Sequence, residues 1–160
     1  MNRERDNIIA LLRQTFEGGA WHGPSVIEAI ENISPEQATL RLPSPVGNRT
    51  HSIIELVSHM TSWRVYVVQK VSGDATYEVT PEMNFPSATD WPEAAHNLRT
   101  SQERLLEALS SMPASRLEEQ VPGREPPLTF YTLVHGIIHH DLYHAGQIMI
   151  IRRTLLPQSI

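Results

Sequence analysis

The sequence predicts an all-α protein, folded as a four-helix bundle. Four long segments carry apolar residues at helical spacing, two long connections lie among them, and no alternating run is long enough for a strand. The chain has 160 residues, of which about two-fifths are apolar, and this is enough for one sizeable core. It shows no repeat, linker or low-complexity segment, so we expect a single domain over residues 1–160.

The first predicted helix covers residues 3–17, and the two glycines that follow are expected to end it. One short extra helix is predicted before the second long helix, from Ser25 to Ile33. A turn is expected directly after it, because Ser34 is followed by Pro35.

The other three long helices are predicted at about residues 50–71, 90–111 and 127–155, the last beginning at Pro127 or Leu128. Thr50 and Asp90 are the expected N-caps of the second and third helices, since a Thr or Asp side chain can accept a hydrogen bond from the first turn. Residues 74–89 hold two prolines and are expected to form a long loop.

The composition excludes several classes of function. The net charge is −5 and the only lysine is Lys70, so a phosphate backbone finds little to bind and we expect no nucleic-acid partner. No apolar stretch approaches the length of a membrane span, and the N-terminus lacks the pattern of a secretory signal, so a cytoplasmic protein is expected. There is no cysteine, which excludes disulfides, thiolate zinc sites and cysteine nucleophiles.

The histidines are the main functional signal. On the fourth helix, His140 and His144 are four residues apart and lie on the apolar stripe, whereas His135 and His139 point elsewhere. On the second helix, His59 shares a face with apolar and aromatic residues. Facing helices of a bundle can build a metal site, and three neutral imidazoles would leave a coordination position open, as in catalytic sites.

Two other interpretations stay open at this point. Histidines on a core stripe can be hydrogen-bonded without a metal, and histidine pairs at this spacing also occur on solvated faces. Asp141 is either an exposed or interhelical polar residue or a partner that orients an imidazole. Gln147 lies on the same stripe as the pair, and Arg64 is expected to form a surface ion pair.

The arrangement resembles the DinB-like family, also called the DinB/YfiT metalloenzymes. The resemblance rests on WHGPS, on ELVSHMTSWR in the second helix and on HHDLYHAGQI in the fourth, and it extends from Trp21 to Arg152. It implies an up-down-down-up bundle, often dimeric, in which three histidines hold a divalent metal, zinc or nickel. By position, these ligands are His59, His140 and His144.

The resemblance also implies a class of reactions on a small-molecule substrate. Some relatives are transferases or isomerases that use a low-molecular-weight thiol such as bacillithiol or mycothiol, and this is the function we expect first. A metal-dependent hydrolase is the alternative, with Asp141, Tyr66 and Gln147 as weak candidates for further catalytic residues. A non-catalytic metal-binding module of the stress response is the third hypothesis. A homodimer is expected from the family alone.

Overall fold

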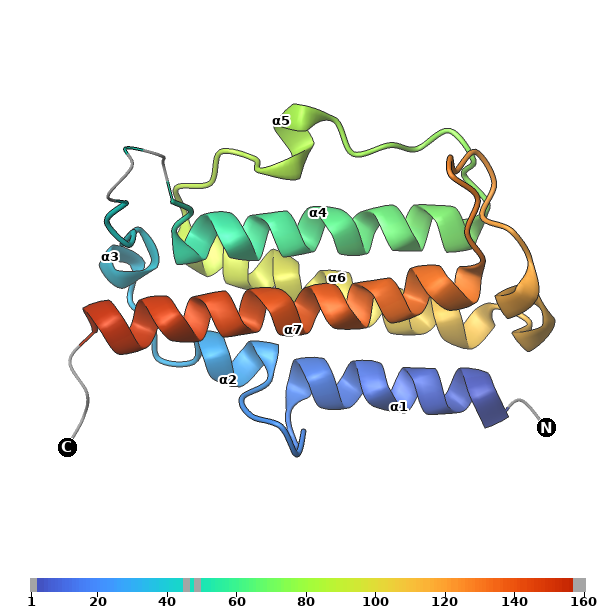
Figure 1. The fold of residues 1–160 in the computed structure, drawn as a ribbon, viewed down its shortest axis with the longest axis horizontal. Coiled ribbons are helices and arrows are strands. Elements are labelled where there is room, and N and C mark those ends of the chain that lie inside the picture. The colour runs from blue at the N-terminus through green and yellow to red at the C-terminus, as the bar shows by residue number, and fades with distance from the viewer. Residues whose placement is uncertain (1–2, 45–46, 48–49, 157–160) are drawn as a thin grey trace.

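The computed structural model describes residues 3–44, 47 and 50–156, which form an all-helical bundle (Figure 1). Its long helices are α1 (Arg3–Glu17), α4 (Ile53–Ser72), α6 (Trp91–Ser111) and α7 (Phe130–Leu155). In Figure 1, α1 and α7 run in one direction and α4 and α6 in the other, so their order is up-down-down-up. Helices α1 and α4 lie diagonally across the bundle, where Arg64 of α4 reaches the ring of Phe16 of α1, and each of the two helices packs against both α6 and α7. The predicted fold class is confirmed.

Short helices occupy the connections: α2 (Val26–Ile30), α3 (Pro35–Ala38), α5 (Pro81–Asn84) and the 3-10 helix η1 (Ala114–Glu118). The prediction of one short helix before α4 is wrong, because α2 ends early and the expected turn at Ser34 begins α3. Ser25 and Ser34 each accept a hydrogen bond from the backbone three residues on, and Asn32 between the helices has a φ of 58°. The two seryl caps therefore produce two helices.

Two long helices begin later than predicted. Helix α4 starts at Ile53, because Thr50 holds the preceding segment instead: its hydroxyl donates to the Leu42 carbonyl at 2.6 Å. Helix α7 starts at Phe130, where the Thr129 side chain accepts from the backbone of the first turn.

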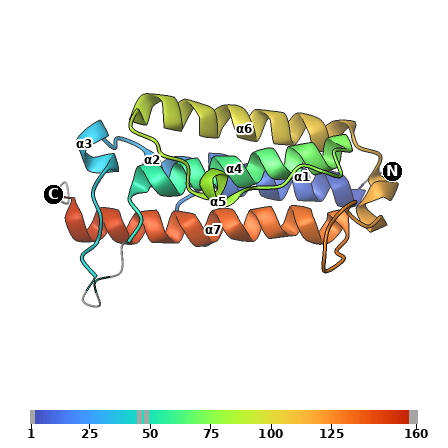
Figure 2. The same ribbon diagram turned by 90° about the horizontal axis from the view of Figure 1, so that it is seen from above.

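The connection between α4 and α6 runs back along the outer side of α4 (Figures 1 and 2). It leaves the helix at Gly73, whose φ of 101° favours glycine. Buried Lys70 fixes the path by donating to the Ala75 carbonyl and to Glu78. The predicted loop contains the single turn α5, and this turn brings Asn84 and Phe85 over the side of α4 that carries His59.

The core consists of two apolar clusters with a charged layer between them. One cluster includes Phe16, Met60, Leu98 and Ala145, and the other includes Leu12, Val67, Leu105 and Ile138. Between them, Arg64 of α4, Asp141 of α7 and Gln102 of α6 form what we call the buried polar layer. None of the described helices is long and apolar enough to cross a membrane.

Candidate metal centre

Helices α4 and α7 bring together His59, His140 and His144, which we call the histidine triad. The Nε2 atom of His140 lies 2.9 Å from that of His59 and 3.1 Å from that of His144. One ring nitrogen of each residue lies within 4.8 Å of the others. These are the residues that the helical spacing and the family resemblance indicated, although His59 and His140 are 81 positions apart in the sequence.

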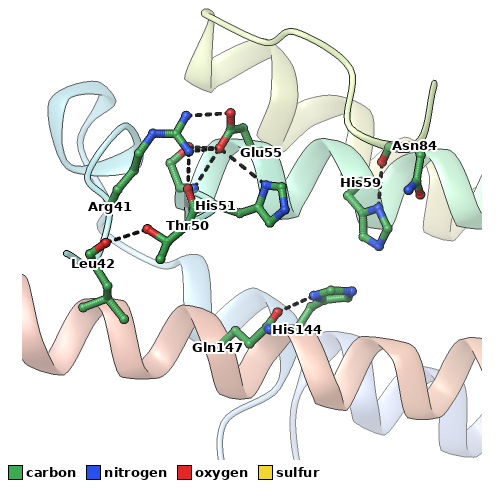
Figure 3. A network of polar contacts seen from close by, with 10 residues as sticks. Arg41, Leu42, Thr50, His51, Glu55, His59, Asn84, His144 and Gln147 are labelled. Atoms are coloured by element: carbon green, nitrogen blue, oxygen red, sulfur yellow. Dashed lines mark hydrogen bonds and ion pairs between the residues drawn. The ribbon is translucent and has the colours of Figure 1, made fainter. Parts of the chain in front are cut away.

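Hydrogen bonds on the far side of two rings fix their tautomers. His59 Nδ1 donates to the Asn84 carbonyl at 2.7 Å, and His144 Nδ1 donates to Gln147 Oε1 at the same distance (Figure 3). A neutral imidazole carries one proton, and an oxygen acceptor requires that proton on Nδ1. The Nε2 atoms of both rings therefore present lone pairs toward His140.

His140 cannot satisfy both neighbours. A proton on its Nε2 can be donated to only one of them, and its buried Nδ1 has no hydrogen-bond partner among the described residues. A cation accepts all three Nε2 lone pairs at once. Two nitrogens bound to one tetrahedral zinc lie about 3.3 Å apart, close to the separations that His140 makes here. The donor set thus fits a divalent metal with imidazole ligands.

The electrostatics keep the triad neutral. Burial, together with the neighbouring histidines and Arg64, lowers the pKa of His140 to about 3. Burial is also the main reason that the pKa of His144 falls to about 4, and it lowers the pKa of His59. Near pH 7 these rings are therefore uncharged, which is the form that binds a metal ion.

An aromatic stack covers the outer side of the triad. Phe85 lies parallel to the His59 ring at a centroid distance of 4.2 Å, and His51 lies parallel to Phe85 at 3.8 Å. Trp63 holds the same segment, because its indole N–H donates to the Asn84 side chain at 2.9 Å. No pattern in the sequence indicates His51, Asn84 or Phe85, since no periodicity predicts which face of a helix a loop covers.

Of the weaker candidates, Gln147 contacts the triad and the other two lie elsewhere. Asp141 is fully buried and accepts from Arg64 at 2.6 Å, so it is interhelical. Burial raises the pKa of Asp141 to about 6 against the opposing effect of Arg64. The expected surface ion pair of Arg64 is wrong, because its side chain is wholly enclosed. Tyr66 packs beside Trp63, with Lys70 over its ring.

The remaining histidines of α7 lie away from the triad. His139 is exposed, and His135 Nδ1 donates to the Tyr131 carbonyl one turn earlier in the helix. The five histidines outside the triad are therefore not equivalent to its members. Within the described part of the chain, His51 is the one of these five that is joined to the triad, through the ring of Phe85.

Comparisons with known proteins agree with this architecture. The model of the DinB superfamily matches residues 21–148. The crystal structure of a DinB-like protein, YjoA of Bacillus subtilis, is similar with a TM-score of 0.69, over 96% of this chain and 95% of that one. The two sequences are 16% identical, so this likeness shows the fold alone. No curated protein matches the sequence.

Proposed function

Because the chain belongs to the DinB superfamily, and because its histidine triad directs three nitrogens to one point, we propose that it is a metal-dependent enzyme. His59, His140 and His144 hold the divalent cation through Nε2. Zinc and nickel both suit imidazole ligands. The observation that carries the proposal is the pair of outward Nδ1–H bonds, which leave Nε2 lone pairs facing one another in a buried site.

The reaction that we propose is the transfer or isomerisation of a small electrophilic substrate with a low-molecular-weight thiol. A bound divalent cation with an open position lowers the pKa of a thiol, which supplies a thiolate near neutral pH. The chain has no cysteine, so the thiol comes from a small molecule such as bacillithiol or mycothiol. Asn84 and Gln147 hold two rings in position, and Phe85 keeps water from the outer face of His59.

This reaction is preferred over hydrolysis because hydrolysis also requires a base for the proton of water. Asp141 is held by Arg64 inside the core. Burial, as the main cause, raises the pKa of Tyr66, so its hydroxyl is a poor base. Gln147 does not titrate. None of the three candidates therefore supplies the proton acceptor that a hydrolase needs.

The test is a conjugation assay with three thiols, bacillithiol, mycothiol and glutathione, and monochlorobimane as the electrophile. Metal-loaded protein is expected to accelerate conjugation with at least one thiol, and a chelator removes that activity. His140→Ala is expected to lower the rate at least tenfold, whereas His139→Ala, on the exposed side of the same helix, keeps it.

Two outcomes of that assay contradict the proposal. Metal binding without conjugation of any of the three thiols leaves a non-catalytic metal-binding module. Chelator-sensitive hydrolysis of an ester or amide panel, in place of conjugation, assigns the site to a hydrolase.

A further inference from the structure

A cavity of about 260 Å³ lies in the groove between the start of α4 and the C-terminal half of α7, and we call it the α4–α7 groove. Four aliphatic residues form the apolar part of its wall: Leu42 comes from the preceding segment, Leu56 from α4, and Ile150 and Ile151 from α7. Thr50, His51 and Gln147 form the polar part. Ile150 is 57% exposed, although it is a large aliphatic residue. The cavity has the liquid volume of about nine water molecules, so it suits a compact molecule.

The groove adjoins the histidine triad on both helices. Gln147 lines it on α7 and accepts the Nδ1 proton of His144. His51 lines it just before α4 and stacks on Phe85, which stacks on His59. Figure 3 shows His51 and Gln147 together with His59 and His144. A molecule in the groove therefore lies beside the triad, one helical turn along each helix.

The polar groups of the groove select a neutral hydrogen-bond acceptor. The amide oxygen of Gln147 is used by His144, while its amide nitrogen donates no hydrogen bond to any described residue. No Lys, Arg, Asp or Glu is among the described residues that line the cavity, and the His51 that lines it already has its Nδ1 3.8 Å from the Glu55 carboxylate. The nearby Arg41 is committed, because it donates to Glu55 and to the Thr50 carbonyl. A carboxylate would lose hydration here without a free Lys or Arg side chain to pair with, and it would lie near the Glu55 carboxylate beside His51.

We infer that the α4–α7 groove binds the substrate of the proposed reaction, and that this substrate is a compact, largely apolar molecule with a neutral carbonyl. Gln147 donates from its amide nitrogen to the carbonyl oxygen, and Leu42, Leu56 and Ile150 enclose the apolar body. This inference rests on the proposed function, because it identifies the reacting molecule by the walls of the groove beside the triad.

The test is an NMR titration of isotope-labelled, metal-loaded protein with acetophenone, and with benzoate as the charged probe of similar size. Acetophenone is expected to shift the amide resonances of Leu56, Gln147 and Ile150 with a Kd on the order of 1 mM, as befits so small a ligand. Benzoate is expected to bind at least fivefold more weakly. Equal or tighter binding of benzoate overturns the neutral-carbonyl assignment.

Two variants locate the binding site. Ile150→Lys places a charge in the groove and is expected to weaken acetophenone binding about tenfold. Leu11→Lys is its matched control, an exposed aliphatic residue on α1, and it is expected to bind acetophenone as the wild type does. Gln147→Glu keeps an oxygen acceptor for His144 but removes the amide donor, so it is expected to lose the preference for acetophenone. Equal binding by the two lysine variants overturns the inference.

The same titration separates this inference from the proposed function. Acetophenone binding in the groove of a protein that takes up no metal keeps the groove and contradicts the metal-dependent enzyme. Stoichiometric metal without any acetophenone shift at the groove keeps the metal site and contradicts the groove assignment.

Discussion

Helices α4 and α7 carry two buried polar clusters side by side, and the two differ in how their polar atoms are paired. In the buried polar layer, Arg64 donates to Asp141 at 2.6 Å and lies over the ring of Phe16. Gln102 links the layer to α1 by donating to the Leu12 carbonyl. In the histidine triad, the outward nitrogens of His59 and His144 alone have oxygen partners among the residues that the structure describes. The ion pair joins the two opposite charges of the layer, although Asp141 Oδ1 has no hydrogen-bond partner among the described residues, whereas the triad directs three ring nitrogens toward its own centre.

The difference separates a structural role from a ligand-binding role. A buried charge requires a partner, and Arg64 and Asp141 each supply one for the other at the level where all four long helices meet. The triad leaves lone pairs facing each other in a largely buried site, which costs stability until a ligand accepts them. Arg64 and Asp141 are wholly enclosed and His140 is half-buried, but the clearer difference is the direction of the hydrogen bonds, which makes the triad the candidate ligand site.

The largest expected effect on stability comes from removing one partner of the ion pair in the buried polar layer. Arg64→Ala leaves the Asp141 carboxylate without its partner, and the free energy of unfolding in a urea titration is expected to fall by about 3–5 kcal/mol. The double variant Arg64→Met/Asp141→Leu restores most of this loss, because it removes both charges together. If Arg64→Ala is as stable as the wild type, the structural role of the buried polar layer is contradicted.

Two glutamines give a matched pair across the two clusters. Gln147→Ala removes the acceptor that orients His144 and is expected to weaken metal affinity about 10- to 100-fold in a competition titration. Gln102→Ala acts on the buried polar layer, so it is expected to lower the unfolding free energy by about 1–2 kcal/mol and to keep metal affinity. Equal effects of both variants on metal affinity go against the separation of the clusters.

A third polar cluster, at the start of α4, is partly exposed and shows a smaller, pH-dependent effect. Burial alone would raise the pKa of Glu55, but hydrogen bonds from Arg41 and from the Ser52 backbone lower it to about 2. Since the folded pKa lies below the ordinary value of 4.5, this stabilisation is present above pH 4.5 and is lost as the pH falls toward 2. The expected loss is roughly 1–2 kcal/mol.

The variant Glu55→Gln tests whether Glu55 is the source of this pH dependence of stability. Its unfolding free energy is expected to depend less on pH between 4.5 and 2 than that of the wild type. The same pH slope in both proteins contradicts the assignment of the effect to Glu55.

The smallest expected effect on stability comes from changing the histidine triad in metal-free protein. In chelator-treated protein, His140→Leu removes a buried ring whose Nδ1 has no partner, so the unfolding free energy is expected to stay equal or rise by up to about 1 kcal/mol. Exposed His139→Leu is the control, with a change within about 0.5 kcal/mol. If the unfolding free energy of His140→Leu falls by several kcal/mol, the triad stabilises the fold through its hydrogen bonds, and this prediction is contradicted.

The sequence alone predicts the parts of this picture that depend on helical period. The four long helices follow from their apolar spacing, and the same spacing separates His140 and His144 from His139. Helical spacing does not predict features that depend on tertiary contacts. Arginine is usually an exposed residue, yet Arg64 is buried, because Asp141 on another helix neutralises its charge.

The covering of the triad is not predictable for the same physical reason. Phe85 and Asn84 belong to a proline-containing connection without periodicity, and only the path fixed by Lys70 and Gly73 brings them to His59. Thr50 is the N-cap that the sequence predicts for α4, but its hydroxyl donates to the Leu42 carbonyl, a contact that no local pattern indicates, and Ser52 is the N-cap. Several local hydrogen bonds are possible for such a residue, and the tertiary contacts of the folded chain determine which of them forms.

The most direct test of the central claim is metal stoichiometry. Chelator-treated protein is equilibrated with zinc or nickel, desalted and subjected to elemental analysis, for the wild type and for His59→Ala, His140→Ala, His144→Ala and His135→Ala. The account predicts about one ion per chain in the wild type and in His135→Ala, and less than about a tenth of that in each triad variant. No ion in the wild type, or equal metal content in all five proteins, would contradict it.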